Sequence, residues 1–385
     1  MTGSALRTVI HAVLAAATLA SAAPSLAQRS SVTDALRGIG QLVMPNQLDS
    51  SATTAHAKDK RCEQLFEVAD VTGNAAVLVP AVTATALNLG ARDVQAVLKD
   101  ERLRNGTKNQ LWIPAEAENR LARSAHAELV SKQQVVDDDD LNQMDRLSVA
   151  KIRTIVDELV GQLPPDQPYK FEVYLTNEDE ANARALPGGL IYVSKAAARG
   201  SNELLTILLA HEVAHVTKRH QSRLLQGRLV DSVTSIDQLI NLLRGNPETI
   251  TAVMGQAGGL NARFARFSAD QELEADACAV RLGAAKPGFD VRSGVDAFLG
   301  MIEKESGGKK GRPSAANELK FSFDAAHPSY QERAQTMHGL IAYWRKEQDK
   351  GVPKAAANEP TPAAAQKPDS GLRGLLDSAR KVIGR

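Results

Sequence analysis

The sequence has little cysteine, few aromatic side chains and almost no net charge. Its two cysteines, Cys62 and Cys278, allow at most one disulfide, and the residues alone leave open whether they pair or remain as buried thiols. The formal net charge of +1 gives no support for nucleic-acid binding, which normally shows as a basic excess. A chain of 385 residues, 43% of them hydrophobic, has room for a full core and one or two domains.

Long apolar runs are absent beyond the N-terminus. The best later candidate, 75–89, is interrupted by Pro80 and two threonines. We therefore expect a buried helix there and no membrane span.

The first 27 residues have a different composition. One charged side chain, Arg7, precedes an apolar, alanine-rich run at 9–23, and the segment ends in Ser25-Leu26-Ala27, a small-x-small cleavage pattern. This pattern predicts a cleavable signal peptide and export to the periplasm. A retained anchor is the alternative, but the run is short for a span.

Composition and periodicity divide the chain into six expected segments. They are a signal peptide (1–27), a flexible leader (28–60), an N-terminal helical region (61–113), a main domain (114–347), a disordered linker (348–370) and a short amphipathic C-terminal helix (371–385). The linker is predicted from its run of Ala, Pro, Lys, Glu and Thr.

The main domain is expected to be mostly helical, with a small sheet of three or four strands. Helical spacing follows Pro114, and Leu141, Met144, Ile152, Ile155 and Leu159 are expected to share one buried face. Further helices are expected from a cap at Ser201 or Asn202 towards His220, over 224–243, around 250 and over 269–282.

Two strands are expected before the helix that starts near Ser201. The stretch 171–175 begins with alternating apolar and polar residues, and a turn with two glycines leads into the second strand, made of Leu190, Ile191, Tyr192 and Val193. Pro187 at its entry favours an edge position, because proline cannot donate to a strand ladder.

The apolar run ILLAHEVAHV (207–216) contains His211, Glu212 and His215. Burying three titratable groups is costly unless a partner pairs with them. Histidines at i and i+4 project from one side of a helix, which allows both imidazoles to bind one zinc ion. In the motif H-E-x-x-H the glutamate does not ligate and instead accepts a proton from a water that the metal acidifies. The alternative is two core histidines satisfied by backbone carbonyls.

A third protein ligand is expected from an acidic segment further along the chain. Glu272 and Asp276 are four residues apart and share a helix face, whereas Glu274 points about 200° away from Glu272. If Glu272 binds the ion, Asp276 is placed to hold the outer nitrogen of a ligand histidine. The alternative is an acidic helix start stabilised by the helix dipole.

Together these motifs resemble the HtpX and CAAX-prenyl-protease family of gluzincin metallopeptidases, in its soluble periplasmic BepA-like branch. The family pattern is H-E-x-x-H followed by E-x-x-x-D, and the segments NARALPGG (182–189) and AHPSYQER (326–333) are also similar. The resemblance covers about residues 114–344. It implies an α+β, mainly helical zincin-like metallopeptidase domain with a small β-sheet next to the active-site helix.

The resemblance also implies the site residues. One Zn²⁺ per chain would be held by His211, His215 and Glu272, with Glu212 as base and Asp276 in support. His327 matches a family histidine that approaches the metal and closes the site or steadies the oxyanion, so it is expected to be catalytic. The alternative for His327 is a helix cap before Pro328.

The chain departs from the family at several positions. Ala269 and Ala279 replace a usual arginine and a usual glycine, and the tail after Trp344 lacks a helical-repeat domain. His220, at the end of the motif helix, is expected to be structural. His56, His126 and His338 have no partner spacing and are expected on the surface or in packing.

The predicted function is a periplasmic zinc endopeptidase that cleaves unfolded or damaged envelope proteins paired along the edge strand. The alternative is a zinc-stabilised chaperone for envelope or outer-membrane proteins with little proteolysis. A third reading is recruitment to envelope assembly machinery through the C-terminal segment.

Overall fold

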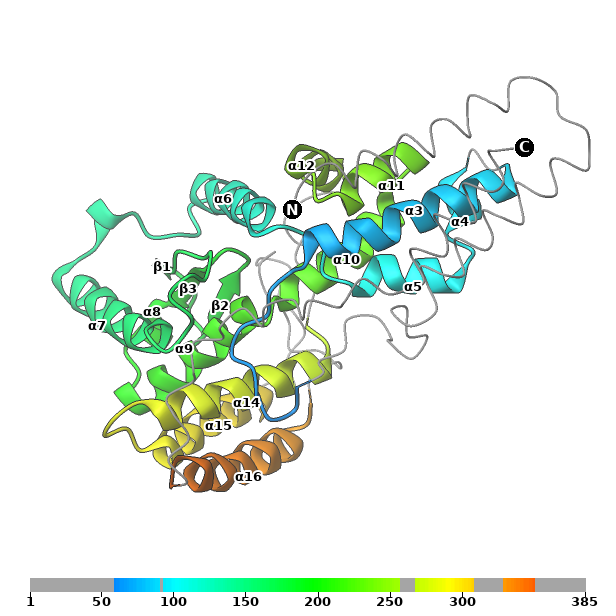
Figure 1. Cartoon of the computed structure of the whole chain (residues 1–385). Helices are drawn as coiled ribbons and strands as arrows, with labels where there is room; N and C mark the ends of the chain where they lie inside the picture. The colour runs from blue at the N-terminus through cyan, green and yellow to red at the C-terminus, as the bar shows by residue number, and fades with distance from the viewer. Residues whose placement is uncertain (1–58, 91–92, 257–266, 308–327, 350–385) are drawn as a thin grey trace, which may run out of the picture.

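The computed structural model describes residues 59–90, 93–256, 267–307 and 328–349, and it is mainly helical with one small sheet (Figure 1). This confirms the expected fold class. The helices are α3 (Val71–Leu89), α4 (Val94–Val97), α5 (Glu101–Asn109), α6 (Ala115–Ser131), α7 (Gln143–Val160), α8 (Lys195–Ala198), α9 (Asn202–Thr217), α10 (His220–Ser232), α11 (Ile236–Leu243), α12 (Pro247–Gln256), α14 (Ala269–Ala285), α15 (Val291–Gly307) and α16 (Tyr330–Asp349), with a 3₁₀ turn at Asp138–Asp140. The expected signal peptide, the C-terminal helix, and His56 and His327 lie outside the described residues, as does nearly all of the leader. The expected linker also lies outside them, except for its first two residues, which end α16.

The sheet has three strands in the order β1-β3-β2. β1 (Glu172–Thr176) pairs parallel with β3 (Leu190–Ser194), and β2 (Ala183–Leu186) pairs antiparallel with β3. Ile191 and Val193 share a core with α7 and α9, whereas Leu190 and Tyr192 share a second core with α6. Residues that alternate along a strand point to opposite faces, so helices cover the sheet on both sides.

The prediction that Leu190–Val193 form the edge strand is wrong. β3 lies in the centre of the sheet, and each of its residues is buried, as is typical of a strand covered on both faces. Pro187 belongs to the turn between β2 and β3, where it interrupts no strand ladder. Gly188 and Gly189 have φ angles of 83° and 95°, a region that favours glycine. A Cβ atom at Gly189 would lie 2.9 Å from the carbonyl oxygen of Lys170, so the turn also needs glycine for space.

β2 is therefore an edge strand. The outer side of β1 is partly covered, because Val135 bridges Thr176 and the N–H of Val136 donates to the carbonyl of Leu175. Within the described ranges, the outer side of β2 has no strand partner.

The helices around the motif begin where capping residues predict. The side chain of Ser201 accepts a hydrogen bond from the N–H of Leu204 and caps α9, and Ser268 and Gln271 form a capping box at the start of α14. α9 ends at Thr217, and Arg219, with φ at 54°, separates it from α10. One residue of the predicted α7 stripe is misplaced, because Met144 in the first turn is 67% exposed.

The apolar stretch near Pro80 is a helix, α3, as predicted, but its expected burial is incomplete. By length and composition this helix would be able to cross a membrane, a property that it shares with ordinary core helices. Only 17% of its most apolar window is buried, and Leu87 and Leu89 at its end are exposed. Its inner face packs on α4, α5 and α11.

α9 occupies the centre of the main core. It packs against α14 and α15 on one side and against α7 and β2 on the other (Figure 1). All its residues from Leu205 to Thr217 are buried, which explains why its sequence has no polar face. Side chains that this part of α9 carries, including His211, Glu212 and His215, are therefore removed from bulk water.

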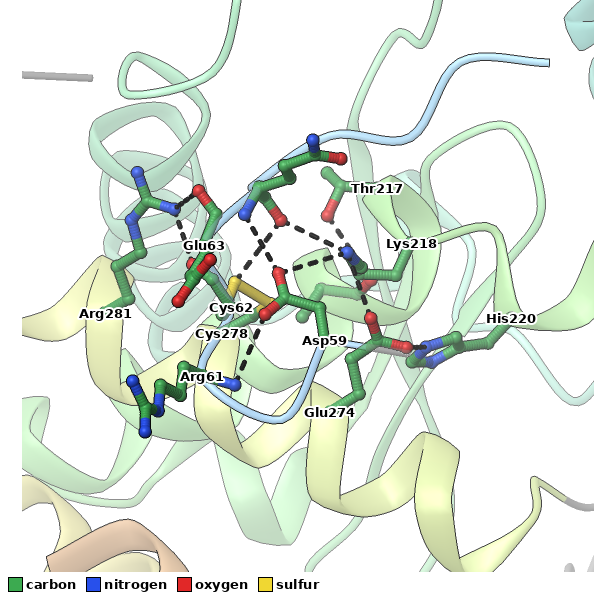
Figure 2. Close-up of a disulfide and its surroundings, with 12 residues drawn as sticks. Asp59, Arg61, Cys62, Glu63, Thr217, Lys218, His220, Glu274, Cys278 and Arg281 are labelled. Atoms are coloured by element: carbon green, nitrogen blue, oxygen red, sulfur yellow. Dashed lines mark hydrogen bonds and ion pairs between the residues drawn. A yellow bond between two sulfur atoms is a disulfide. The ribbon is translucent and has the colours of Figure 1, made fainter. Parts of the chain in front are cut away.

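A short segment of residues 59–67, which we call the strap, lies beside the end of α9. The pairing that the sequence leaves open is present, since Cys62 of the strap is disulfide-bonded to Cys278 of α14 (Figure 2). The guanidinium of Arg281 also donates to the carbonyls of Cys62 and Glu63. The strap is thus fixed to α14 through covalent and polar contacts.

Candidate metal centre

His211 and His215 meet on one side of α9, as their spacing predicts. Their Nε2 atoms lie 2.9 Å apart, and both side chains are buried. Glu272 reaches the same point from α14, which packs directly against α9. Its carboxylate oxygens lie 3.5 Å from Nε2 of His211 and 3.7 Å from Nε2 of His215. Two separate helices therefore bring three donor groups together.

The donor set fits a divalent metal ion. One ligand atom from each of the three residues lies within 4.8 Å of the others. Two ligands bound at 2.0–2.1 Å to a tetrahedral ion are about 3.3 Å apart, and the observed separations lie on both sides of this value. Two imidazoles and one carboxylate are also the ligand types that catalytic zinc sites use.

The electrostatics of the cluster favour a cation. Burial lowers the pKa of His211, but the carboxylates of Asp276 and Glu272 outweigh burial and raise this pKa to about 9. Burial and the charge of His211 hold the pKa of His215 well below its usual value, so this imidazole is neutral. The carboxylates thus stabilise positive charge at the point where the histidine Nε2 atoms meet, and a metal ion would gain from the same field.

Asp276 lies behind His211, as predicted for a supporting carboxylate. Its Oδ1 is 3.0 Å from Nδ1 of His211, a contact distance without an aligned hydrogen bond. Arg333 of α16 donates two hydrogen bonds to Asp276, at 2.7 and 2.6 Å, and lies 3.6 Å from Glu272. Burial raises the pKa of Asp276, but Arg333 and His211 outweigh it and hold this pKa below the ordinary value.

Arg333 ends the family-like segment AHPSYQER (326–333), but only the structure shows that it pairs with Asp276. We expect Arg333→Met to destabilise the metal-free protein by about 3–5 kcal/mol, because it leaves the buried Asp276 carboxylate uncompensated. Urea unfolding in a chelator measures this change. The control is Arg345→Met, which removes an exposed arginine from the same helix. Equal stability of Arg333→Met and wild type would contradict the assigned pairing.

Glu212 lies next to the three donor groups and is not one of them. Burial is the main reason that its pKa rises to about 7, with a further contribution from Glu272. Its carboxylate accepts a hydrogen bond from the backbone N–H of Ala185 in β2. This contact places the carboxylate between α9 and the edge strand.

Three histidines acquire partners that the sequence did not indicate. His220, expected only to suit a helix end, is fully buried, and its Nδ1 lies 2.9 Å from Nδ1 of His215. His126 makes a 2.9 Å contact with the hydroxyl of Tyr192, and His338 lies 3.2 Å from Asp296. The position of His220 five residues after His215 was the only signal for its contact.

Comparisons with known proteins agree with this geometry. Residues 147–341, just over half of the chain, match the family model of Peptidase family M48. The beta-barrel assembly-enhancing protease of Escherichia coli (strain K12) is 31% identical over 126 residues, which are 31% of this chain and 26% of that protein. The protein of the same name from Yersinia pestis is 31% identical over 144 residues, which are 35% of this chain and 29% of that protein. The matched region thus spans less than a third of either relative.

Proposed function

The chain belongs to peptidase family M48, and from this premise we propose that it is an exported zinc endopeptidase that cleaves unfolded or damaged envelope proteins. The observation that carries the proposal is the buried convergence of His211, His215 and Glu272 beside Glu212. Export is supported by the signal-like composition of residues 1–27.

We propose that Nε2 of His211, Nε2 of His215 and the carboxylate of Glu272 hold one zinc ion per chain. When bound, zinc would act as a Lewis acid that polarises the scissile carbonyl and makes water more acidic. Asp276, held by Arg333, keeps negative charge behind His211 and so favours a cationic centre.

Glu212 is the proposed general base. It would accept a proton from the attacking water and return it to the leaving amine. The backbone N–H of Ala185 orients its carboxylate, and burial keeps the carboxylate away from competing solvent. His327 stays a proposed catalytic residue on the family resemblance alone, since it lies outside the described residues.

We propose β2 as the strand that binds substrate, in place of Leu190–Val193. The N–H of Ser194 donates to the carbonyl of Asn182. In an antiparallel ladder, every second residue turns its N–H and C=O groups away from the partner strand. Ala183 and Ala185 therefore point these groups away from β3. The N–H of Ala185 meets Glu212, which brings this edge next to the proposed base. A substrate must be extended to pair with such an edge, and main-chain pairing is largely independent of side-chain identity.

The relatives support a substrate class in the cell envelope. Their name describes a protease that enhances β-barrel assembly, and the similarity covers only part of each protein. Unfolded envelope proteins have the extended backbone that β2 would accept. Contact with envelope assembly machinery through the C-terminal segment remains a further part of the proposal.

Metal analysis combined with a folded-versus-unfolded substrate pair tests the proposal. The purified protein should carry one zinc per chain and cleave reduced, denatured casein, while a tightly folded control protein survives. Glu272→Ala should lose both zinc and cleavage, whereas Glu248→Ala, which removes an exposed carboxylate of α12, should lose neither. Absence of bound metal in wild type, or full activity of Glu272→Ala, would overturn the proposal.

A further inference from the structure

A second buried histidine lies directly behind His215. His220 is the first residue of α10, and its Nδ1 is 2.9 Å from Nδ1 of His215. On its other side, Nε2 of His220 is 3.0 Å from Oε2 of Glu274. The exposed fraction of His220 is 0% and that of Glu274 is 1%, so bulk solvent does not reach either group. The two contacts form a continuous path from the metal centre to a carboxylate.

The direction of the hydrogen bonds along this path follows from its last group. An ionised carboxylate only accepts hydrogen bonds, so the contact with Glu274 requires a proton on Nε2 of His220. Neutral His220 then has a bare Nδ1, which accepts the proton that Nδ1 of His215 donates. The remaining nitrogen of His215, Nε2, is left without a proton. This is the atom that faces His211 and Glu272.

Glu274 is held in place by a cation on its far side. The ammonium of Lys218 lies 3.0 Å from Oε1 of Glu274, and only 3% of Lys218 is exposed. Burying such a pair costs desolvation energy, so its presence beside His220 calls for a reason other than stability. Lys218 keeps Glu274 ionised, and only an ionised Glu274 fixes the proton of His220 on Nε2.

Residues of the strap contact the ammonium of Lys218 directly (Figure 2). The carbonyl of Gln64 accepts a hydrogen bond from Lys218 at 3.2 Å, and the carboxylate of Asp59 lies 3.6 Å from the same ammonium. The N–H of Glu67 also donates to the carbonyl of Thr217 at the end of α9. The disulfide to α14 fixes the strap, and through it the position of Lys218.

We propose that His220 is a positioning residue for the metal centre: with Glu274 and Lys218 it keeps the proton of His215 on Nδ1 and presents Nε2 as a free ligand. The inference rests on the proposed metal site and adds an assignment that the H-E-x-x-H and E-x-x-x-D motifs do not contain. The centre is thus asymmetric. His211 has a carboxylate directly behind it, whereas His215 reaches its carboxylate through a second imidazole.

Zinc affinity and histidine NMR of the full chain test the assignment. His220→Leu removes the acceptor, and we expect zinc to bind about 10–100-fold more weakly in competition with a chromophoric chelator. In ¹⁵N spectra of the metal-free, histidine-labelled proteins, His215 should be the Nδ1–H tautomer in wild type and the Nε2–H tautomer in His220→Leu. His220→Gln, whose carbonyl oxygen is able to accept from His215, should recover most of the affinity. The matched control is His126→Leu, which removes a histidine bonded to Tyr192 and should leave affinity unchanged.

Glu274→Gln gives a second reading if His220→Leu fails to fold. The glutamine amide is able either to donate to or to accept from Nε2 of His220, so it no longer fixes where the proton of His220 lies. The spectra should then show mixed tautomers of His220 and His215, and zinc should bind several-fold more weakly. Wild-type zinc affinity and an unchanged His215 tautomer in either variant would overturn the inference. Failure of the proposed function looks different, because wild type itself would then bind no zinc or cleave nothing.

Discussion

Glu212→Gln should abolish peptide cleavage and leave zinc content unchanged. The glutamine amide has nearly the shape of the carboxylate but is unable to take a proton from water, so the general-base contribution is lost. We expect a fall in kcat of about 10³-fold, within the range that positioned acid–base groups supply. Metal retention follows because Glu212 is not among the three converging donor groups. Steady-state cleavage of a fluorogenic peptide, together with elemental analysis, measures both quantities.

Glu203→Gln is the matched control for this substitution. It makes the same chemical change in the first turn of α9, at a half-buried residue outside the metal centre, and should leave both kcat and zinc content as in wild type. Cleavage by Glu212→Gln at the wild-type rate would exclude Glu212 as the base. A cellular phenotype that survives Glu212→Gln would instead favour the chaperone reading, in which substrate is held and rarely cut.

The motif helix and its partner could be predicted from the sequence because the necessary information is local. The cap at Ser201 fixes where α9 begins, and the i,i+4 spacing fixes the common side of His211 and His215. The same rule separates Glu272 from Glu274 on α14. The structure agrees, since Glu272 meets the two motif histidines while Glu274 faces His220.

Features that depend on chain segments distant in sequence were missed. The position of Pro187 predicts an edge strand at 190–193, but strand order depends on the pairing between β1 and β3, which no local pattern encodes. The contact between His220 and His215 depends on Arg219, whose left-handed backbone conformation turns the chain between the end of α9 and the start of α10. Arg333 similarly meets Asp276 only because α16 packs on α14.

Removing the disulfide should produce the largest loss of stability of any change outside the metal centre. The bond joins residues 216 positions apart, so it closes a long loop and removes much conformational freedom from the unfolded chain. The loop-entropy relation gives about 5 kcal/mol for a loop of this length. We expect the double variant Cys62→Ala/Cys278→Ala to melt roughly 10–20 °C below wild type. Alanine is chosen because both positions are fully buried and apolar.

Reductant provides the matched control for the double variant. Wild type treated with dithiothreitol under mildly denaturing conditions should melt at the lower temperature of the alanine variant, while the variant itself should not respond to reductant. Because the strap contacts Lys218, the variant should also expose residues 59–67 to proteases and bind zinc less tightly. A melting temperature that neither substitution nor reduction changes would mean that the polar contacts of Arg281 and Lys218 hold the strap without the covalent bond.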